Sequence, residues 1–257
     1  MSGNRASVLR EMGLAPLWRL RAAQGGPAAA ATAGVAEMAA ERESIPPAPP
    51  PPSAPQPARR EERLARIARM GWAELREAVA ACRDCKLCER RKQAVLGVGD
   101  ERADWLFVGE GPGADEDEKG EPFVGQAGKL LDNMLAAIGI RRGQNVYIAN
   151  TVKCRPPGNR TPEAEEMAAC FPYLARQVEL LQPKLIVALG RPAAQSLLDT
   201  EVKIAAARGR LFDHHGIPVA VTYHPAYLLR NLPDKAKAWE DLCFARNTMR
   251  RSAAGVE

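Results

Sequence analysis

The stretch 104–125, DWLFVGEGPGADEDEKGEPFVG, joins an apolar run to a glycine-rich turn and then to a run of acids. A short apolar run that ends at a turn is typical of a strand buried on both faces of a parallel sheet. In such a sheet the functional groups lie in the loops that follow the carboxyl ends of the strands. The turn 109–114 is therefore the first candidate for a binding loop.

This turn, GEGPGA, satisfies the loose dinucleotide-binding pattern G-x-G-x-x-A, which is a weak signal when it occurs alone. The acids at 115–118 would face a pyrophosphate with like charge, no helix-forming run follows directly, and the Gly-Lys-Ser/Thr of a P-loop does not occur here. We therefore expect the loop to hold a flat, uncharged ligand, because glycines let backbone amides approach such a ligand closely. This interpretation disfavours a nucleotide-dependent oxidoreductase.

Outward from this stretch, strand-like runs alternate with helical ones. The strand-like runs are DWLFVG (104–109), NVYIANTV (145–152), KLIVALG (184–190) and IPVAVTYH (217–224), and the helical ones are 126–139, 161–181 and 191–198. The alternation predicts an α/β fold of three layers, α/β/α, in which helices cover both faces of a central four-stranded parallel sheet. Asn150, Gly190 and His224 then fall at carboxyl ends of strands, as the turn 109–114 does.

The helical stretch 161–181 carries its own boundary signals. Thr161, Pro162 and Glu163 supply a capping residue, a proline for the first turn and an acid near the positive end of the helix dipole. Pro172 is predicted to kink this helix or to restart it, because proline removes a hydrogen bond from the helix interior.

By composition the 257-residue chain divides into two parts. Residues 1–60 are rich in alanine and proline, and we predict a disordered extension that begins with a short amphipathic segment. Residues 61–251 form the predicted folded domain, with a first helical pattern in 61–82. The extension is a candidate tether for a protein partner.

Charge and hydropathy limit the choice of partner and of cellular compartment. A formal net charge of +5 and a pI near 9.0 favour an anionic partner such as nucleic acid, but only mildly. No apolar run approaches the roughly 20 residues that a membrane span needs, and the first residues lack the apolar core of a secretory signal. We therefore expect a cytoplasmic protein of bacterial type, without a membrane partner and with reduced cysteines.

The six cysteines fall into two spaced groups and one isolated residue: Cys82, Cys85 and Cys88 as C-x2-C-x2-C, Cys154 and Cys170 as C-x15-C, and Cys243 alone. Thiols at such spacings can close a tetrahedral zinc site or hold an iron–sulfur cluster. The spacing alone favours neither metal over the other, and it leaves the role of Cys88 open.

Beyond these patterns, the chain resembles a known family from about residue 82 to residue 241. The motifs GEGPG, EPFVGQAG, NTVKCRPPGNR and YHPAYLLRN occur in the order and spacing of the family 4 uracil-DNA glycosylases, which are thermostable-type enzymes carrying a four-iron cluster. The resemblance implies a four-stranded parallel sheet between helices. It also implies a [4Fe–4S] cluster held by Cys82, Cys85, Cys154 and Cys170, in preference to zinc.

The same resemblance implies how a uracil is held. Phe123 matches an aromatic residue that stacks on the flipped base, and Asn150 matches the residue that reads its edge. An amide offers a donor to O4 and an acceptor to N3–H, whereas cytosine presents the reverse polarity. Backbone amides around Gly111 would bind O2, and Glu116 would crowd C5 and so reject the methyl group of thymine.

Catalytic roles follow from the resemblance as well. His224 matches a histidine that donates a hydrogen bond to uracil O2, where negative charge grows as the glycosidic bond breaks. Glu110 is the nearest carboxylate to the place where another branch of the superfamily carries an aspartate, and we expect it to position water or to balance a cationic sugar. His214 and His215 are expected to be structural.

The predicted partner is uracil-containing DNA, single- or double-stranded, bound by a monomer. Leu228 and Leu229 are candidates for insertion into the gap left by the flipped base, and Arg230 and Asn159 for contacts with DNA. The predicted reaction is hydrolytic removal of uracil at the start of base excision repair. The alternative is a non-catalytic DNA-damage-binding or replication-associated protein with the same fold.

Overall fold

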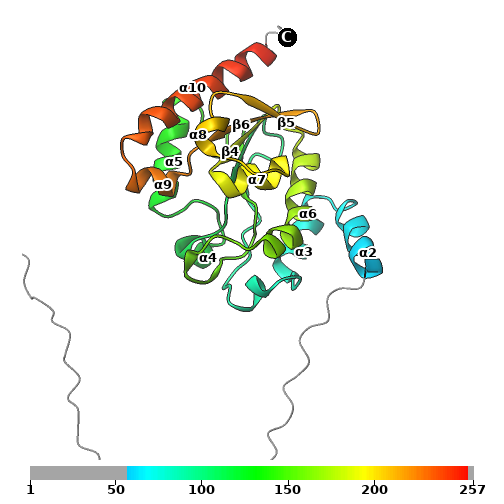
Figure 1. The fold of residues 1–257 in the computed structure, drawn as a ribbon. Coiled ribbons are helices and arrows are strands. Elements are labelled where there is room, and N and C mark those ends of the chain that lie inside the picture. The colour runs from blue at the N-terminus through cyan, green and yellow to red at the C-terminus, as the bar shows by residue number, and fades with distance from the viewer. Residues whose placement is uncertain (1–56, 254–257) are drawn as a thin grey trace, which may run out of the picture. The chain divides into compact units, whose positions relative to one another are not determined.

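The computed structural model describes residues 57–253, and their centre is one six-stranded mixed sheet (Figure 1). The strand order is β1-β3-β2-β4-β6-β5. The four inner strands are parallel to one another: β2 (Trp105–Gly109), β3 (Val146–Asn150), β4 (Leu185–Leu189) and β6 (Ile217–Thr222). They are the four strand-like runs of the sequence.

The predicted count of four strands was wrong, because an antiparallel strand is added at each edge. β1 (Val98–Gly99) pairs with β3, and β5 (Leu211–His214) forms a hairpin with β6. β1 has only two residues, and most of β5 is exposed or half-buried. Neither edge strand therefore carries the buried apolar run by which the inner strands were found.

Helices cover both faces of the sheet, as the three-layer prediction requires. Successive residues of the inner strands point to opposite faces of the sheet, so Leu106 and Phe107 belong to different cores. One core packs against α6 (Ala164–Leu181), α7 (Arg191–Leu198) and α8 (Ile204–Ala207), and the other against α5 (Gln126–Ala137), α9 (Pro225–Arg230) and α10 (Asp234–Ala253) (Figure 1).

A third core joins the N-terminal helices to α6. α2 (Pro57–Ile67), α3 (Trp72–Ala81) and the 3-10 helix η1 (Lys86–Glu89) contribute Ile67, Leu75 and Leu87, which pack around Cys154 and Cys170. The described structure thus begins a few residues before the predicted boundary at residue 61. Most of the predicted disordered extension, residues 1–56, lies outside the described residues.

Two local expectations were wrong. A helix, α4 (Ala114–Lys119), does begin directly after the glycine turn, because Glu116 caps it by accepting a hydrogen bond from the Gly113 amide at 3.0 Å. The helix expected from Thr161 begins instead at Ala164, with Glu163 as its N-cap.

Pro172 does not restart α6, which is one element from Ala164 to Leu181. The 3-10 helix η2 (Pro157–Asn159) lies between β3 and α6. Across residues 57–253, the structure contains no helix with the length and apolar character of a membrane span.

Candidate functional site

A cleft of about 860 Å³ opens at the carboxyl ends of the parallel strands. Eight of the residues predicted for the site line it: Glu110, Gly111, Glu116, Phe123, Asn150, Asn159, His224 and Arg230. The loops after β2, β3, β4 and β6 all contribute to its wall, which is where a parallel sheet of this kind places its ligands.

Asn150 is the last residue of β3 and is only 2% exposed. Its side-chain oxygen Oδ1 is buried and has no hydrogen-bond partner within residues 57–253. Gly109, its register partner on β2, makes room for it, because a Cβ at Gly109 would stand 2.5 Å from Asn150 Oδ1 and 2.5 Å from Phe123 Cζ. A buried acceptor without a partner costs about 1–3 kcal/mol, so this oxygen is a candidate for contact with a ligand that donates a hydrogen bond.

Phe123 has a left-handed backbone conformation, with φ of 55°, which is a strained state for a bulky residue. Arg142 holds the turn in place: Nη1 donates to the Pro122 carbonyl and Nη2 to the Phe123 carbonyl, both at 2.8 Å. The Phe123 ring lies 5.5 Å from the His224 ring, with 31° between the planes. Strain of this kind at a cleft fits a side chain that is positioned for a ligand.

His224 is the N-cap of α9, and its Nδ1 accepts a hydrogen bond from the Ala226 amide at 3.1 Å. Nδ1 is therefore unprotonated, and Nε2 carries the proton of the neutral ring. Burial, and secondarily the charge of Arg230, lowers the pKa of His224 to about 4. At neutral pH the side chain is thus a neutral donor at Nε2.

We expect this depressed pKa to be visible by NMR. Above pH 5, ¹H–¹⁵N spectra of the three histidines should show His224 neutral, with its proton on Nε2. The unfolded chain binds the proton near pH 6.5 and the folded chain near pH 4, so stability is lost as pH falls through this window, by about 3 kcal/mol at most. Variants His214→Asn and His215→Asn assign the signals. A His224 resonance that titrates near 6.5 would contradict the assignment.

Two acidic residues of the cleft have different surroundings. Burial raises the pKa of Glu110, while a hydrogen bond with Thr161 and the charge of Arg191 oppose the rise. Glu116 is fully committed to backbone amides: besides Gly113, it accepts hydrogen bonds from Val124 at 2.9 Å and Gly125 at 3.1 Å. Glu116 therefore joins α4 to the Phe123 turn at a fixed position on the cleft wall.

One of the two leucines predicted for insertion into DNA is misplaced. Leu228 is 1% exposed and belongs to the core formed with α5 and α10, so it is not available for contact with DNA. Leu229 is 41% exposed, and Leu232, which the sequence reasoning missed, is 60% exposed. Neighbouring residues of a helix point about 100° apart, so a helix that buries residue 228 turns residue 229 towards solvent.

Sequence reasoning also missed several residues of the cleft wall, among them Arg160, Thr161, Arg191 and Tyr223. Arg191 directly follows Gly190 at the end of β4, so its position after a strand was a usable signal. Asn159, which was predicted, accepts a hydrogen bond from Arg155 Nε at 2.7 Å and remains exposed. His214, expected to be structural, is buried, with Nδ1 2.7 Å from the Leu197 carbonyl oxygen.

Five cysteines line a second cavity, between α3, η1 and α6: Cys82, Cys85, Cys88, Cys154 and Cys170. Burial raises the pKa of Cys85 to about 11 and that of Cys170 to about 12, so a bound metal would have to displace these protons. In the described part of the chain, no three His, Cys, Asp or Glu side chains are arranged around a single ion position. The cavity nevertheless supplies the four predicted thiol ligands, from the segment between α3 and η1, the loop after β3, and α6.

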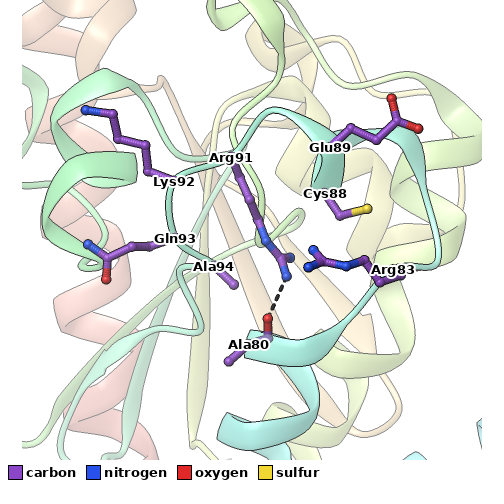
Figure 2. Close-up of a pocket in the computed structure, with 8 residues that line it drawn as sticks. All are labelled: Ala80, Arg83, Cys88, Glu89, Arg91, Lys92, Gln93 and Ala94. Atoms are coloured by element: carbon purple, nitrogen blue, oxygen red, sulfur yellow. Dashed lines mark hydrogen bonds between the residues drawn. The ribbon is translucent and has the colours of Figure 1, made fainter.

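Basic groups surround these thiols. Arg91 donates to Cys154 Sγ at 2.8 Å and to the carbonyl oxygens of Ala80 and Cys82. Figure 2 shows Arg91 reaching towards Ala80 at the end of α3, with Cys88 and Arg83 beside it. Cationic hydrogen-bond donors next to sulfur favour thiolates, so the donor set fits a thiolate-bound metal or cluster.

Comparison with known proteins identifies the family. The family model described as Uracil DNA glycosylase superfamily matches residues 96–243. The Type-4 uracil-DNA glycosylase of Archaeoglobus fulgidus is 49% identical over 159 residues, which cover 59% of this chain and 79% of that protein. Its counterpart in Thermotoga maritima is 45% identical over 179 residues, or 68% of this chain and 93% of that protein.

A third relative, the Type-4 uracil-DNA glycosylase of Pyrobaculum aerophilum, is 42% identical over 179 residues, covering 66% of this chain and 91% of that protein. The matched region contains the parallel sheet and every wall of the cleft. The chain therefore belongs to the uracil DNA glycosylase superfamily, in its type-4 group.

Proposed function

We propose that this protein removes uracil from DNA by hydrolysing the N-glycosidic bond of a flipped-out deoxyuridine, the first step of base excision repair. One observation carries the proposal: Asn150, whose amide oxygen is buried and unpartnered among residues 57–253, and the neutral donor His224 line one cleft. A flat base with an N–H edge and a carbonyl edge satisfies both.

Recognition requires the base to leave the duplex, at a cost of a few kcal/mol for unstacking. In the cleft, the Phe123 ring would stack on the base and Asn150 Oδ1 would accept the uracil N3–H. Cytosine has a bare acceptor at N3, which would face Asn150 Oδ1 without a proton between them and leave buried polar groups unpaired. Glu116, fixed by three backbone amides, would occupy the space that the thymine methyl group needs.

In the reaction, the bond from C1′ to uracil N1 breaks with its electron pair on the base, and water adds to C1′ of the sugar. The proton that the water loses goes to the solvent or to the departing base. Negative charge then grows on O2, where His224 Nε2–H and the backbone near Gly111 would stabilise it. Glu110, which lines the cleft, would balance the cationic sugar or orient the water. The charge of Arg191 favours its carboxylate form, against the rise in pKa that burial causes. A neutral histidine can fill this role, because Nε2–H is free to donate to O2 while Nδ1 accepts from the Ala226 amide.

The DNA backbone would run across the mouth of the cleft. Arg230 and Arg191 are exposed there and would meet phosphates, with Asn159 close by. Leu229 would enter the gap left by the flipped nucleotide, with Leu232 beside it. We expect a monomer that acts on uracil in single- or double-stranded DNA, in the cytoplasm.

For the thiol cavity we propose a [4Fe–4S] cluster held by Cys82, Cys85, Cys154 and Cys170, with zinc as the second candidate. Such a cluster would join the chain at the end of α3 to α6. Protein purified without oxygen should be brown and contain about four iron and four sulfide per chain. Colourless protein that contains zinc would contradict the cluster.

The function is tested with a single-stranded and a duplex oligonucleotide that carry one uracil. Incubation, alkali treatment and a denaturing gel should reveal strand cleavage at the uracil position, and a matching oligonucleotide with thymine should stay intact. The competing function is a non-catalytic DNA-damage-binding or replication-associated protein. It predicts intact strands together with retained binding, measured by gel shift on the same oligonucleotides.

A further inference from the structure

Lys153 is a buried cation situated between the cleft and the thiol cavity. Its residue is 1% exposed, and its ammonium donates to the Asn150 carbonyl oxygen at 2.8 Å and to Gln177 Oε1 at 2.5 Å. Both acceptors are neutral. No carboxylate within residues 57–253 forms an ion pair with it.

A buried ammonium without an anion is costly, by several kcal/mol for each ion after relaxation. The thiols of the neighbouring cavity are candidates for the missing negative charge. Lys153 lines their cavity, its backbone amide donates to Cys170 Sγ at 3.2 Å, and Cys154 is the next residue. A cluster ligated by four thiolates has a net negative charge, so an occupied cavity would supply the anion that the described side chains lack.

The other contacts of Lys153 fix its direction. Gln177 is fully buried, and its Nε2 donates to the Leu96 carbonyl oxygen at 3.0 Å and to Tyr147 Oη at 3.2 Å. With its amide nitrogen bound in this way, Gln177 turns its oxygen towards Lys153. The ammonium is thereby held against the backbone carbonyl of Asn150, the residue whose side-chain oxygen has no partner in the described part of the chain.

We propose that Lys153 is a positioning residue that couples the iron–sulfur site to uracil recognition. Its ammonium compensates the negative charge of the cluster and, with the same group, holds the end of β3 so that the Asn150 amide faces the base. The proposal rests on the proposed function, since it takes both the cluster and the uracil edge from it.

Removing the charge should therefore change two measurable properties. The midpoint potential of the cluster should fall in Lys153→Met, because a nearby cation favours the reduced, more negative state. The single-turnover rate of uracil excision should fall about tenfold with DNA affinity nearly unchanged, as is typical for partners that orient a ligand residue. Lys184→Met, which alters an exposed lysine at the opposite end of β4, is the matched control and should leave both properties at wild-type values.

A second variant separates charge from position. Gln177→Glu is nearly isosteric and gives Lys153 a carboxylate partner, but its second oxygen cannot donate to the Leu96 carbonyl oxygen, so thermal unfolding must first show that the variant is folded. In folded protein the potential should fall while excision stays within about threefold of wild type. If Lys153→Met accumulates without iron, Gln177→Glu decides the question. Unchanged potentials in the variants that retain iron, or wild-type excision by Lys153→Met, would overturn the proposal. If wild-type protein itself fails to excise uracil, the proposed function fails instead, and the potentials still test the charge of Lys153.

Discussion

Replacing Asn150 with alanine is expected to lower the single-turnover rate of uracil excision by about 10³-fold. The loss has two sources, the missing acceptor for N3–H and the missing fixed edge that orients the base for bond cleavage. The folded state should not suffer, since the buried Oδ1 has no hydrogen-bond partner among residues 57–253 and its removal leaves no group there unsatisfied. The measurements are excision kinetics with excess enzyme and thermal unfolding.

The control for this variant is Asn133→Ala, which changes an exposed asparagine of α5. It should excise uracil at the wild-type rate. If Asn150→Ala retained more than about a tenth of the wild-type rate, the amide would not be the group that reads the base. Melting well below wild type would indicate instead that Asn150 is a structural residue.

Replacing His224 with asparagine is expected to lower the excision rate constant by about 10²–10³-fold, the usual cost of one oxyanion donor. Binding of uracil-containing DNA should stay within about threefold of wild type, because the donor acts mainly on charge that develops in the transition state. With a His224 pKa of about 4, the neutral ring persists between pH 6 and 8, so protonation of this residue should not shape the rate profile in that range. Rates and gel-shift affinities measured across this range test both statements.

His215→Asn serves as the matched control, because His215 is exposed and distant from the cleft wall, and its left-handed backbone suits asparagine. It should behave as wild type in both assays. A loss of DNA affinity in His224→Asn as large as its loss of rate would assign the histidine to ground-state binding, and the role in catalysis would then be withdrawn.

The inner sheet and most of the candidate site could be predicted because both depend on local patterns. Four buried apolar runs identify β2, β3, β4 and β6. The end of each run then marks a loop at the same edge of the sheet, so the sequence pattern alone assigns Asn150 and His224 to one edge. Their separation in sequence does not matter once the strands are parallel.

The errors share a different physical origin. Leu228 and Leu229 look alike in sequence, and only packing against α5 and α10 buries the first and leaves the second exposed. The edge strands β1 and β5 carry no buried apolar run, so pairing with a neighbour defines them rather than their own composition. Helix α4 is short and acidic. It is stabilised by the Glu116 side chain, which caps its first turn and accepts a hydrogen bond from Val124 in the Phe123 turn.

By itself, the sequence determined the α/β class, the positions along the chain where the parallel strands end, and the polar and thiol side chains available to the two sites. These features depend on periodicity and turn chemistry, which act over a few residues. The tertiary structure alone decided which of those side chains are unpaired. Within the described residues, the unpartnered oxygen of Asn150, the strained Phe123 held by Arg142 and the Lys153 ammonium without a carboxylate are all results of burial. Burial depends on contacts between segments far apart in the chain, and no local pattern contains that information.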